Sequence, residues 1–62
     1  MELEKLILAI ITQDKEKVYG AGAPVFLAIS QEEQDKIALY LARITEGVIH
    51  DLENGVYVLV KH

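Results

Sequence analysis

The sequence contains no cysteine and no tryptophan, and only one proline and one phenylalanine among its 62 residues. Without cysteine the chain can form neither a disulfide nor a thiolate metal site, which are common means of stabilising a protein of this size. A chain of this length makes a single domain, residues 1–62, and buries only about 60% of the surface that it exposes when unfolded. Hydrophobic residues make up 52% of it. We therefore expect aliphatic burial to stabilise the fold, in part between subunits.

Positive charge is also scarce, since six Lys and Arg stand against ten acids and the net charge is −4. The cations are scattered among acids, which argues against binding to a phosphate backbone. The apolar run at residues 6–11 is too short to span a bilayer. It follows Glu2 and Glu4, where a signal peptide would carry positive charge. We expect a soluble, cytoplasmic protein without a membrane association.

Residues 1–18 fit an amphipathic helix better than a strand. Acids stand in the first turn, Lys15 and Lys17 stand in the last, and the apolar residues recur at spacings of three and four. These apolar residues are Leu3, Leu6, Ile7, Ile10 and Ile11. The alternative is a buried strand at residues 6–12, because isoleucine and threonine favour strands. We predict a helix that is capped by Gly20.

Residues 20–24, Gly-Ala-Gly-Ala-Pro, are rich in residues that interrupt helices and strands. A phosphate loop would need a helix directly after the glycines, whereas Pro24 and an apolar run follow here. We interpret this stretch as a flexible linker. The apolar run at residues 25–29 predicts a short strand, and Pro24 before it suits the edge of a sheet.

A second helix is predicted to begin at Ser30, because Ser30 and Glu33 form a capping box. It runs through Glu46 and stops at Gly47. Its apolar face carries Ile37, Tyr40, Leu41 and Ile44, and the side chains largely turned away are Gln34, Asp35, Arg43 and Glu46. The acids at its start, Glu32, Glu33 and Asp35, are explained by capping and the helix dipole, with a basic partner as the alternative.

Residues 48–61 predict a hairpin, because Asn54-Gly55 lies between two alternating apolar runs. A two-residue turn there would mix acids with valines on one face. A three-residue turn, with Glu53 and Asn54 in type I geometry and Gly55 left-handed, instead pairs Leu52 with Val56. We predict this register, which also pairs His50 with Val58 and Val48 with Val60.

The chosen register divides the hairpin into two faces. One is nearly all apolar and is predicted to pack on the helices: Val48, His50, Leu52, Val56, Val58 and Val60. The other carries Ile49, Tyr57 and Leu59, which are too apolar to be left exposed. We predict that these three residues form the contact surface for a partner. If residues 56–60 lie at the edge of the sheet, their amides also invite another strand.

These elements predict a two-layer α+β domain with the order helix, strand, helix, hairpin (α-β-α-β-β), in which two helices lie on one face of a small three-stranded sheet. This order resembles a winged-helix DNA-binding domain, whose hairpin is the wing. Such domains carry three helices, and their recognition helix is basic. This chain shows two helices and the second is acidic, so the resemblance is one of fold only.

No group of residues forms a recognisable catalytic site. His50 and Asp51 are adjacent in a predicted strand, so their side chains point to opposite faces and cannot pair with each other. Neither His50 nor His62 has metal ligands at a suitable spacing. There is no nucleophile elbow and no reactive cysteine. We expect no enzyme activity, no cofactor and no metal.

The sequence predicts a small, non-catalytic protein for protein–protein interaction or regulation, which binds a protein partner or forms a homodimer. One alternative is a winged-helix-like nucleic-acid-binding module, which would need its scattered cations on one face. Another alternative is an acidic inhibitor that presents its carboxylates to a basic partner. The net charge of −4 agrees with the second alternative better than with the first.

Overall fold

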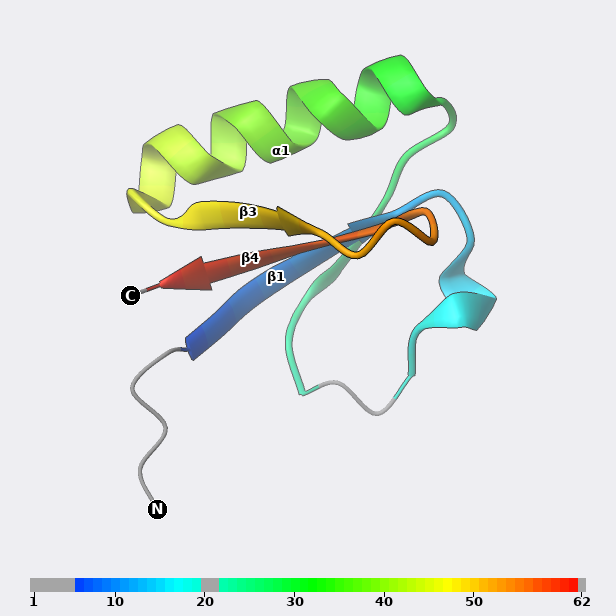
Figure 1. The fold of residues 1–62 in the computed structure, drawn as a ribbon, viewed down its shortest axis with the longest axis horizontal. Coiled ribbons are helices and arrows are strands. Elements are labelled where there is room, and N and C mark those ends of the chain that lie inside the picture. Colours follow the sequence, from blue (N-terminus) through cyan, green and yellow to red (C-terminus); the bar gives the residue numbers. More distant parts are fainter. Residues whose placement is uncertain (1–5, 20–21, 62) are drawn as a thin grey trace.

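The computed structural model describes residues 6–19 and 22–61. The elements in chain order are β1 (Leu6–Thr12), the 3-10 turn η1 (Lys15–Lys17), β2 (Val25–Leu27), α1 (Gln31–Thr45), β3 (Val48–Asp51) and β4 (Val56–Lys61). The strands form one mixed sheet in the order β2-β1-β4-β3, and α1 lies across one face of it (Figure 1). The fold is α+β as predicted, but the described residues form one α-helix on a four-stranded sheet, not two helices on a three-stranded sheet.

Strand β1 takes the place of the helix predicted for residues 1–18. It lies between β2 and β4, and its residues Ile10, Ile11 and Thr12 are buried although they alternate between the two faces. A strand that is covered on both faces is apolar throughout, so its pattern does not show the alternation that distinguishes a strand from a helix. The strand alternative at residues 6–12 is correct. Residues 1–5 and the predicted cap at Gly20 lie outside the described residues.

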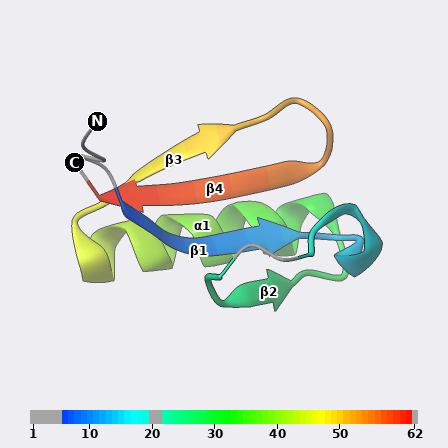
Figure 2. The same cartoon turned by 90° about the horizontal axis from the view of Figure 1, so that it is seen from below.

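After β1 the chain forms only the short turn η1, where the predicted helix would have continued. Asp14 Oδ1 accepts a hydrogen bond of 2.9 Å from the backbone N–H of Glu16 and so begins the turn. The turn lies on the side of the sheet opposite α1 (Figures 1 and 2). Lys17 Nζ donates to the carbonyl oxygen of Asn54 at 2.7 Å. This bond ties η1 to the turn of the hairpin.

Strand β2 runs parallel to β1 and forms one edge of the sheet. The backbone N–H of Ile10 donates to the carbonyl of Pro24, and the N–H of Ala28 donates to the carbonyl of Thr12, both at 2.9 Å. The strand predicted for residues 25–29 is therefore confirmed over its first three residues, and Pro24 precedes an edge strand as expected.

Helix α1 begins at the predicted cap residue Ser30, but the Glu33 carboxylate bonds to the residue before it and not to Ser30, as a capping box would require. The Ser30 hydroxyl accepts from the N–H of Glu33 at 3.1 Å, and Glu33 Oε1 accepts from the N–H of Ile29 at 2.9 Å. The helix ends at Thr45, one residue before the predicted end, because Glu46 takes the left-handed conformation with a φ of 60°.

The face of α1 that meets the sheet is not the predicted one. Gln34 was expected to point away, yet it is buried together with Ala38. Tyr40 and Ile44 were expected on the apolar face, yet both are exposed. The remaining predicted contacts, Ile37 and Leu41, are partly buried. A small Ala38 lets the helix approach the sheet closely, and the hydrogen bonds of Gln34 offset the cost of burying its amide.

Strands β3 and β4 pair in the predicted register, with Asp51 opposite Tyr57 and His50 opposite Val58. The predicted left-handed Gly55 is found, with a φ of 92°, but Glu53 is also left-handed, with a φ of 64°. The turn therefore does not have the predicted type I geometry. Strand β4 pairs with β1 on one side and β3 on the other, so it is central and has no free edge.

The two faces of the hairpin are reversed relative to the prediction. The core under α1 consists of Ala9, Ile11, Ala38 and Leu59, and Ile49 and Tyr57 pack against it. The face predicted to pack on helices points away from α1. Both faces of the hairpin are apolar, so alternation alone could not say which of them would meet a helix.

Candidate protein-binding face

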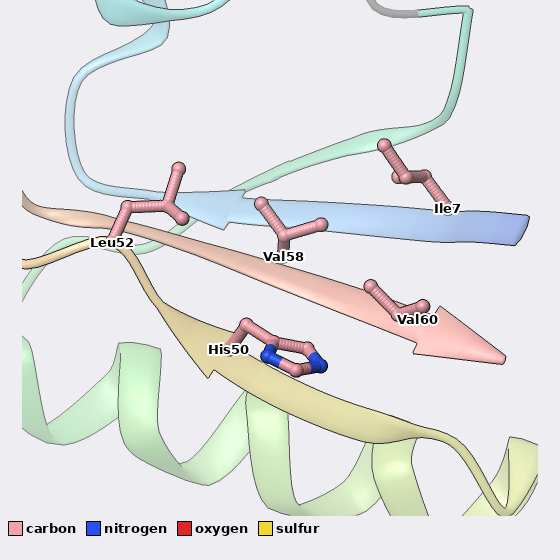
Figure 3. Close-up of a pocket in the computed structure, with 5 residues that line it drawn as sticks. All are labelled: Ile7, His50, Leu52, Val58 and Val60. Atoms are coloured by element: carbon pink, nitrogen blue, oxygen red, sulfur yellow. The ribbon is translucent and has the colours of Figure 1, made fainter. Parts of the chain in front are cut away.

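The side of the sheet that faces away from α1 carries a hollow of about 480 Å³, which five side chains line. They come from three neighbouring strands and the start of the hairpin turn: Ile7, His50, Leu52, Val58 and Val60 (Figure 3). Ile7 pairs with Val60 and His50 pairs with Val58, and side chains of directly opposed residues share one face. We call these five residues the open sheet face.

The open sheet face has an exposed apolar rim and a buried floor. Ile7 and Leu52 are each 52% exposed, whereas Val60 is only 8% exposed. Val48 is opposite Val60 and extends the exposed apolar surface along β3. A site for a small polar molecule usually has several convergent polar groups, and here His50 is the one polar residue among the five that line the hollow. The surface therefore suits an apolar partner.

This face is open because α1, the one α-helix among the described residues, covers the other face. The turn η1 lies on the open side but is held at the hairpin turn by the bond from Lys17 to Asn54. On this same side Ile10 and Val56 are buried, while the rim at Ile7 remains exposed. The fold therefore covers one end of this face and leaves the other end to solvent.

His50 lies among apolar side chains, as predicted, and its neighbour Asp51 belongs to the opposite face of the strand. Within residues 6–19 and 22–61, no three His, Asp or Glu side chains come together in a group that could hold a metal ion. His62 lies outside the described residues. No helix in the described part of the chain is both long and apolar enough to cross a membrane.

The predicted contact residues Ile49, Tyr57 and Leu59 do come together, but on the face that packs under α1. Leu59 is 0% exposed, and Ile49 and Tyr57 are partly buried against the core. Their contact with a partner stays a prediction, although the exposed apolar surface on which it was based is not formed. The exposed apolar side chains lie on the other face of the same hairpin.

The sequence reasoning missed the polar contacts of Tyr57. Its hydroxyl donates to Asp35 Oδ1 at 2.6 Å, and Gln31 Nε2 donates to the Tyr57 hydroxyl at 2.7 Å and to the same Asp35 oxygen at 2.9 Å. The hydrogen bond to Asp35 is the main cause that raises the pKa of Tyr57, and burial adds to it. The i, i+4 spacing of Gln31 and Asp35 could have indicated a shared helix face.

The hydrogen bonds of Gln34 were also not predicted from the sequence. Its side-chain nitrogen donates to the carbonyls of Ile11 and Gly55 at 2.9 and 3.0 Å, and its oxygen accepts from Gln13 Nε2 at 3.0 Å. The amide therefore joins α1 to β1 and to the hairpin turn. These hydrogen bonds hold the helix against the sheet face opposite the open sheet face.

These features define a small α+β protein with one helix-covered sheet face and one open, apolar sheet face. Residues 4–62 match the family described as "Capping complex subunit for YIEGIA", and the chain belongs to this family. It is 42% identical over 60 residues to a Bacillus subtilis (strain 168) protein named "Uncharacterized protein YpzH". The aligned region covers 97% of this chain and 92% of that protein. No solved structure matches the chain. The family makes the chain a subunit of a protein complex.

Proposed function

We propose that the chain is a non-catalytic subunit that binds the YIEGIA protein through the open sheet face. The observation that carries this proposal is the uncovered apolar hollow of about 480 Å³ in a chain whose family is described as a capping complex subunit. The predicted role as an interaction protein agrees with that description, and the partner is a further protein of the complex.

The physical reason for a contact at this place is the apolar rim. Burying apolar surface contributes about 25 cal/mol per Å², and the centre of an interface is depleted in charged residues. Ile7, Leu52 and Val48 are each about half exposed and carry no charge. We expect the partner to insert an aliphatic or aromatic side chain into the hollow, since such anchors supply most of the binding energy.

The non-catalytic part of the proposal rests on the lining of the hollow. General acid–base catalysis needs a titratable side chain placed against a reacting group, and usually a second group that orients it. His50 is the one titratable residue among the five that line the hollow, and the carboxylate next to it in the chain, Asp51, is on the opposite face of the strand.

The test is the affinity of the purified chain for purified YIEGIA protein, measured by isothermal titration calorimetry. Leu52→Asp places a charge on the rim of the hollow, and Leu39→Asp is the matched control on α1, since these two leucines are 52% and 49% exposed. We expect Leu52→Asp to weaken binding at least about tenfold, which corresponds to about 1.4 kcal/mol. The Leu39→Asp variant should bind like the wild type.

Thermal unfolding followed by circular dichroism accompanies both variants, so that a loss of binding is compared only between folded proteins. A wild-type chain that does not bind the YIEGIA protein would refute the proposed function. A loss of binding in Leu39→Asp and none in Leu52→Asp would retain the partner but move the contact to the helix.

A further inference from the structure

The outer edge of β2 offers backbone hydrogen-bonding groups that no strand of the described sheet uses. In the parallel pairing with β1, the groups that point inward belong to Pro24 and Ala28, which bond to Ile10 and Thr12. Backbone groups alternate in direction along a strand, so the N–H and C=O of Val25 and of Leu27 point outward. The edge therefore presents two donors and two acceptors.

This edge lacks the charged side chains that often protect the edges of natural sheets. Residues 18–31 contain no charged side chain, and Val25, Phe26 and Leu27 are all exposed large apolar residues. The other edge strand, β3, ends in Asp51, and an edge with charged residues resists pairing with further strands. The two edges differ, and β2 is the one that is suited to accept a strand.

We propose that β2 pairs antiparallel with β2 of a second copy of this chain, about a two-fold axis at Phe26. Val25 of each copy then lies opposite Leu27 of the other, and each such pair exchanges two hydrogen bonds through the outward groups. The Phe26 residues face each other as a non-hydrogen-bonded pair, in which the side chains approach most closely. Cross-strand aromatic pairs of this kind stabilise an antiparallel ladder.

A second copy fits this edge because the edge is complementary to itself. Its outward donors and acceptors are placed symmetrically about Phe26, as an isologous interface requires. Each chain carries a net charge of −4, so two copies repel each other, and the repulsion is weakest for a contact that brings no charged side chains together. The uncharged stretch at residues 18–31 meets this condition.

The symmetry of the pairing has a consequence for the proposed function. A two-fold axis perpendicular to the sheet joins two four-stranded sheets into one, with both α1 helices on one side and both open sheet faces on the other. The dimer would present two hollows in one direction and could engage two copies of the partner or two sites on one copy. Only this consequence rests on the proposed function, whereas the pairing itself does not.

The first experiment is disulfide trapping, which the absence of natural cysteine makes specific. Two Cys residues can form a disulfide when their Cα atoms are about 4.4 to 6.8 Å apart, and a non-hydrogen-bonded antiparallel pair has a spacing of about 4.5 Å. We expect Phe26→Cys to be trapped as a covalent dimer under mild oxidation at low protein concentration. The control is Tyr40→Cys, which replaces an exposed aromatic residue on α1 and should remain monomeric.

The second experiment is sedimentation velocity of the wild type and of Leu27→Pro, from about 1 to 100 µM. Proline removes the outward N–H of Leu27 and leaves the inward groups of β2 in place. We expect a dimer for the wild type and a monomer for Leu27→Pro, with unchanged circular dichroism. A monomeric wild type over this range, together with equal trapping of Phe26→Cys and Tyr40→Cys, would overturn the proposal.

Binding to the YIEGIA protein, measured for the wild type and for Leu27→Pro, separates the remaining outcomes. If the wild type is monomeric alone but Leu27→Pro loses affinity for the YIEGIA protein, the edge accepts a strand of that partner and the dimer is wrong. If the dimer forms and no YIEGIA binding is found, the dimer stands and the proposed function fails. The two proposals are thus distinguishable.

Discussion

Gln34 reaches from α1 to the sheet and donates its side-chain amide to the backbone carbonyl of Ile11 at 2.9 Å. The same nitrogen donates to the carbonyl of Gly55 at 3.0 Å, although the residue is 0% exposed. Burying an amide costs free energy unless its groups are hydrogen-bonded, and here the nitrogen and the oxygen both have partners. One polar side chain therefore specifies how the helix, the central strand β1 and the hairpin turn fit together.

Replacing this amide should destabilise the fold. Gln34→Met keeps the length of the side chain but removes its hydrogen bonds to the carbonyls of Ile11 and Gly55, which should cost about 1 to 3 kcal/mol of unfolding free energy. Urea unfolding followed by circular dichroism measures the loss. The control is Lys36→Met at an exposed position of the same helix, which should change stability by no more than about 0.5 kcal/mol. Equal effects of the two substitutions would contradict the role of Gln34.

The contact between Tyr57 and Asp35 predicts a dependence of stability on alkaline pH. The pKa of Tyr57 is raised above its ordinary value of 10.0, chiefly because the neutral hydroxyl donates to the Asp35 carboxylate. The folded state therefore holds this proton more tightly than the unfolded chain does. The stabilisation is fully present below pH 10 and is lost as the pH rises through the raised pKa.

Tyr57→Phe tests this dependence, because it removes the hydroxyl and keeps the ring. Unfolding free energy of the wild type should fall more steeply above pH 10 than that of Tyr57→Phe, and the two curves should run parallel at neutral pH. Spectroscopic titration of tyrosinate in both proteins gives the pKa of Tyr57, because its ionisation is present in the wild type and absent from Tyr57→Phe. A pKa of Tyr57 below 10.0 would mean that the hydrogen bond to Asp35 does not stabilise the neutral phenol.

The assignment of the two hairpin faces predicts unequal effects of two leucine truncations. Leu59 is completely buried in the core with Ala9, Ile11 and Ala38, so Leu59→Ala should cost about 3 kcal/mol of unfolding free energy. Leu52 on the open sheet face is half exposed, and Leu52→Ala should cost only about 0.5 kcal/mol. Chemical unfolding of both variants measures the two losses of unfolding free energy. The opposite order would mean that the helix packs on the other face.

The end of α1 predicts opposite effects at two adjacent positions. Glu46 has a left-handed φ of 60°, which costs a residue with a Cβ about 1 kcal/mol, so Glu46→Gly should raise stability slightly. A Cβ on Gly47 would lie 2.9 Å from the carbonyl oxygen of Val60, so Gly47→Ala should lower stability by about 1 to 3 kcal/mol. Thermal unfolding gives the sign of the stability change in each variant. Higher stability in both variants would contradict the close approach at Gly47.

Several features could be read from the sequence because they depend on local chemistry. The Ser30 cap of the helix is formed, although the Glu33 carboxylate bonds to Ile29 and not to Ser30, and the register of β3 and β4 follows from Asn54-Gly55 and the positions of the valines. Such features involve residues a few positions apart, so the sequence contains all the groups that compete. The strand at residues 6–12 was weighed only as an alternative, since a strand buried on both faces has no period of two.

The burial of Gln34 and the exposure of Tyr40 were beyond the reach of pattern reasoning. Gln34 is polar, and its burial is acceptable only because the carbonyls of Ile11 and Gly55 lie within reach, one 23 and the other 21 positions away along the chain. The hydrophobic pattern of an isolated helix cannot supply that information. The exposure expected for Ile49, Tyr57 and Leu59 differs from the structure for a related reason, because it depends on which side of the sheet the helix occupies.

The sequence by itself determined the class of fold, the start of the helix, the pairing of the hairpin and the scarcity of charge around β2. Only the tertiary structure decided which of two apolar hairpin faces became core, because Leu59 and Val58 are equally hydrophobic in pattern and differ only in what packs against them. The fold has one α-helix among its described residues and two apolar sheet faces, so one face had to remain open. That choice left His50 and Leu52 on the exposed apolar face and buried Leu59 in the core.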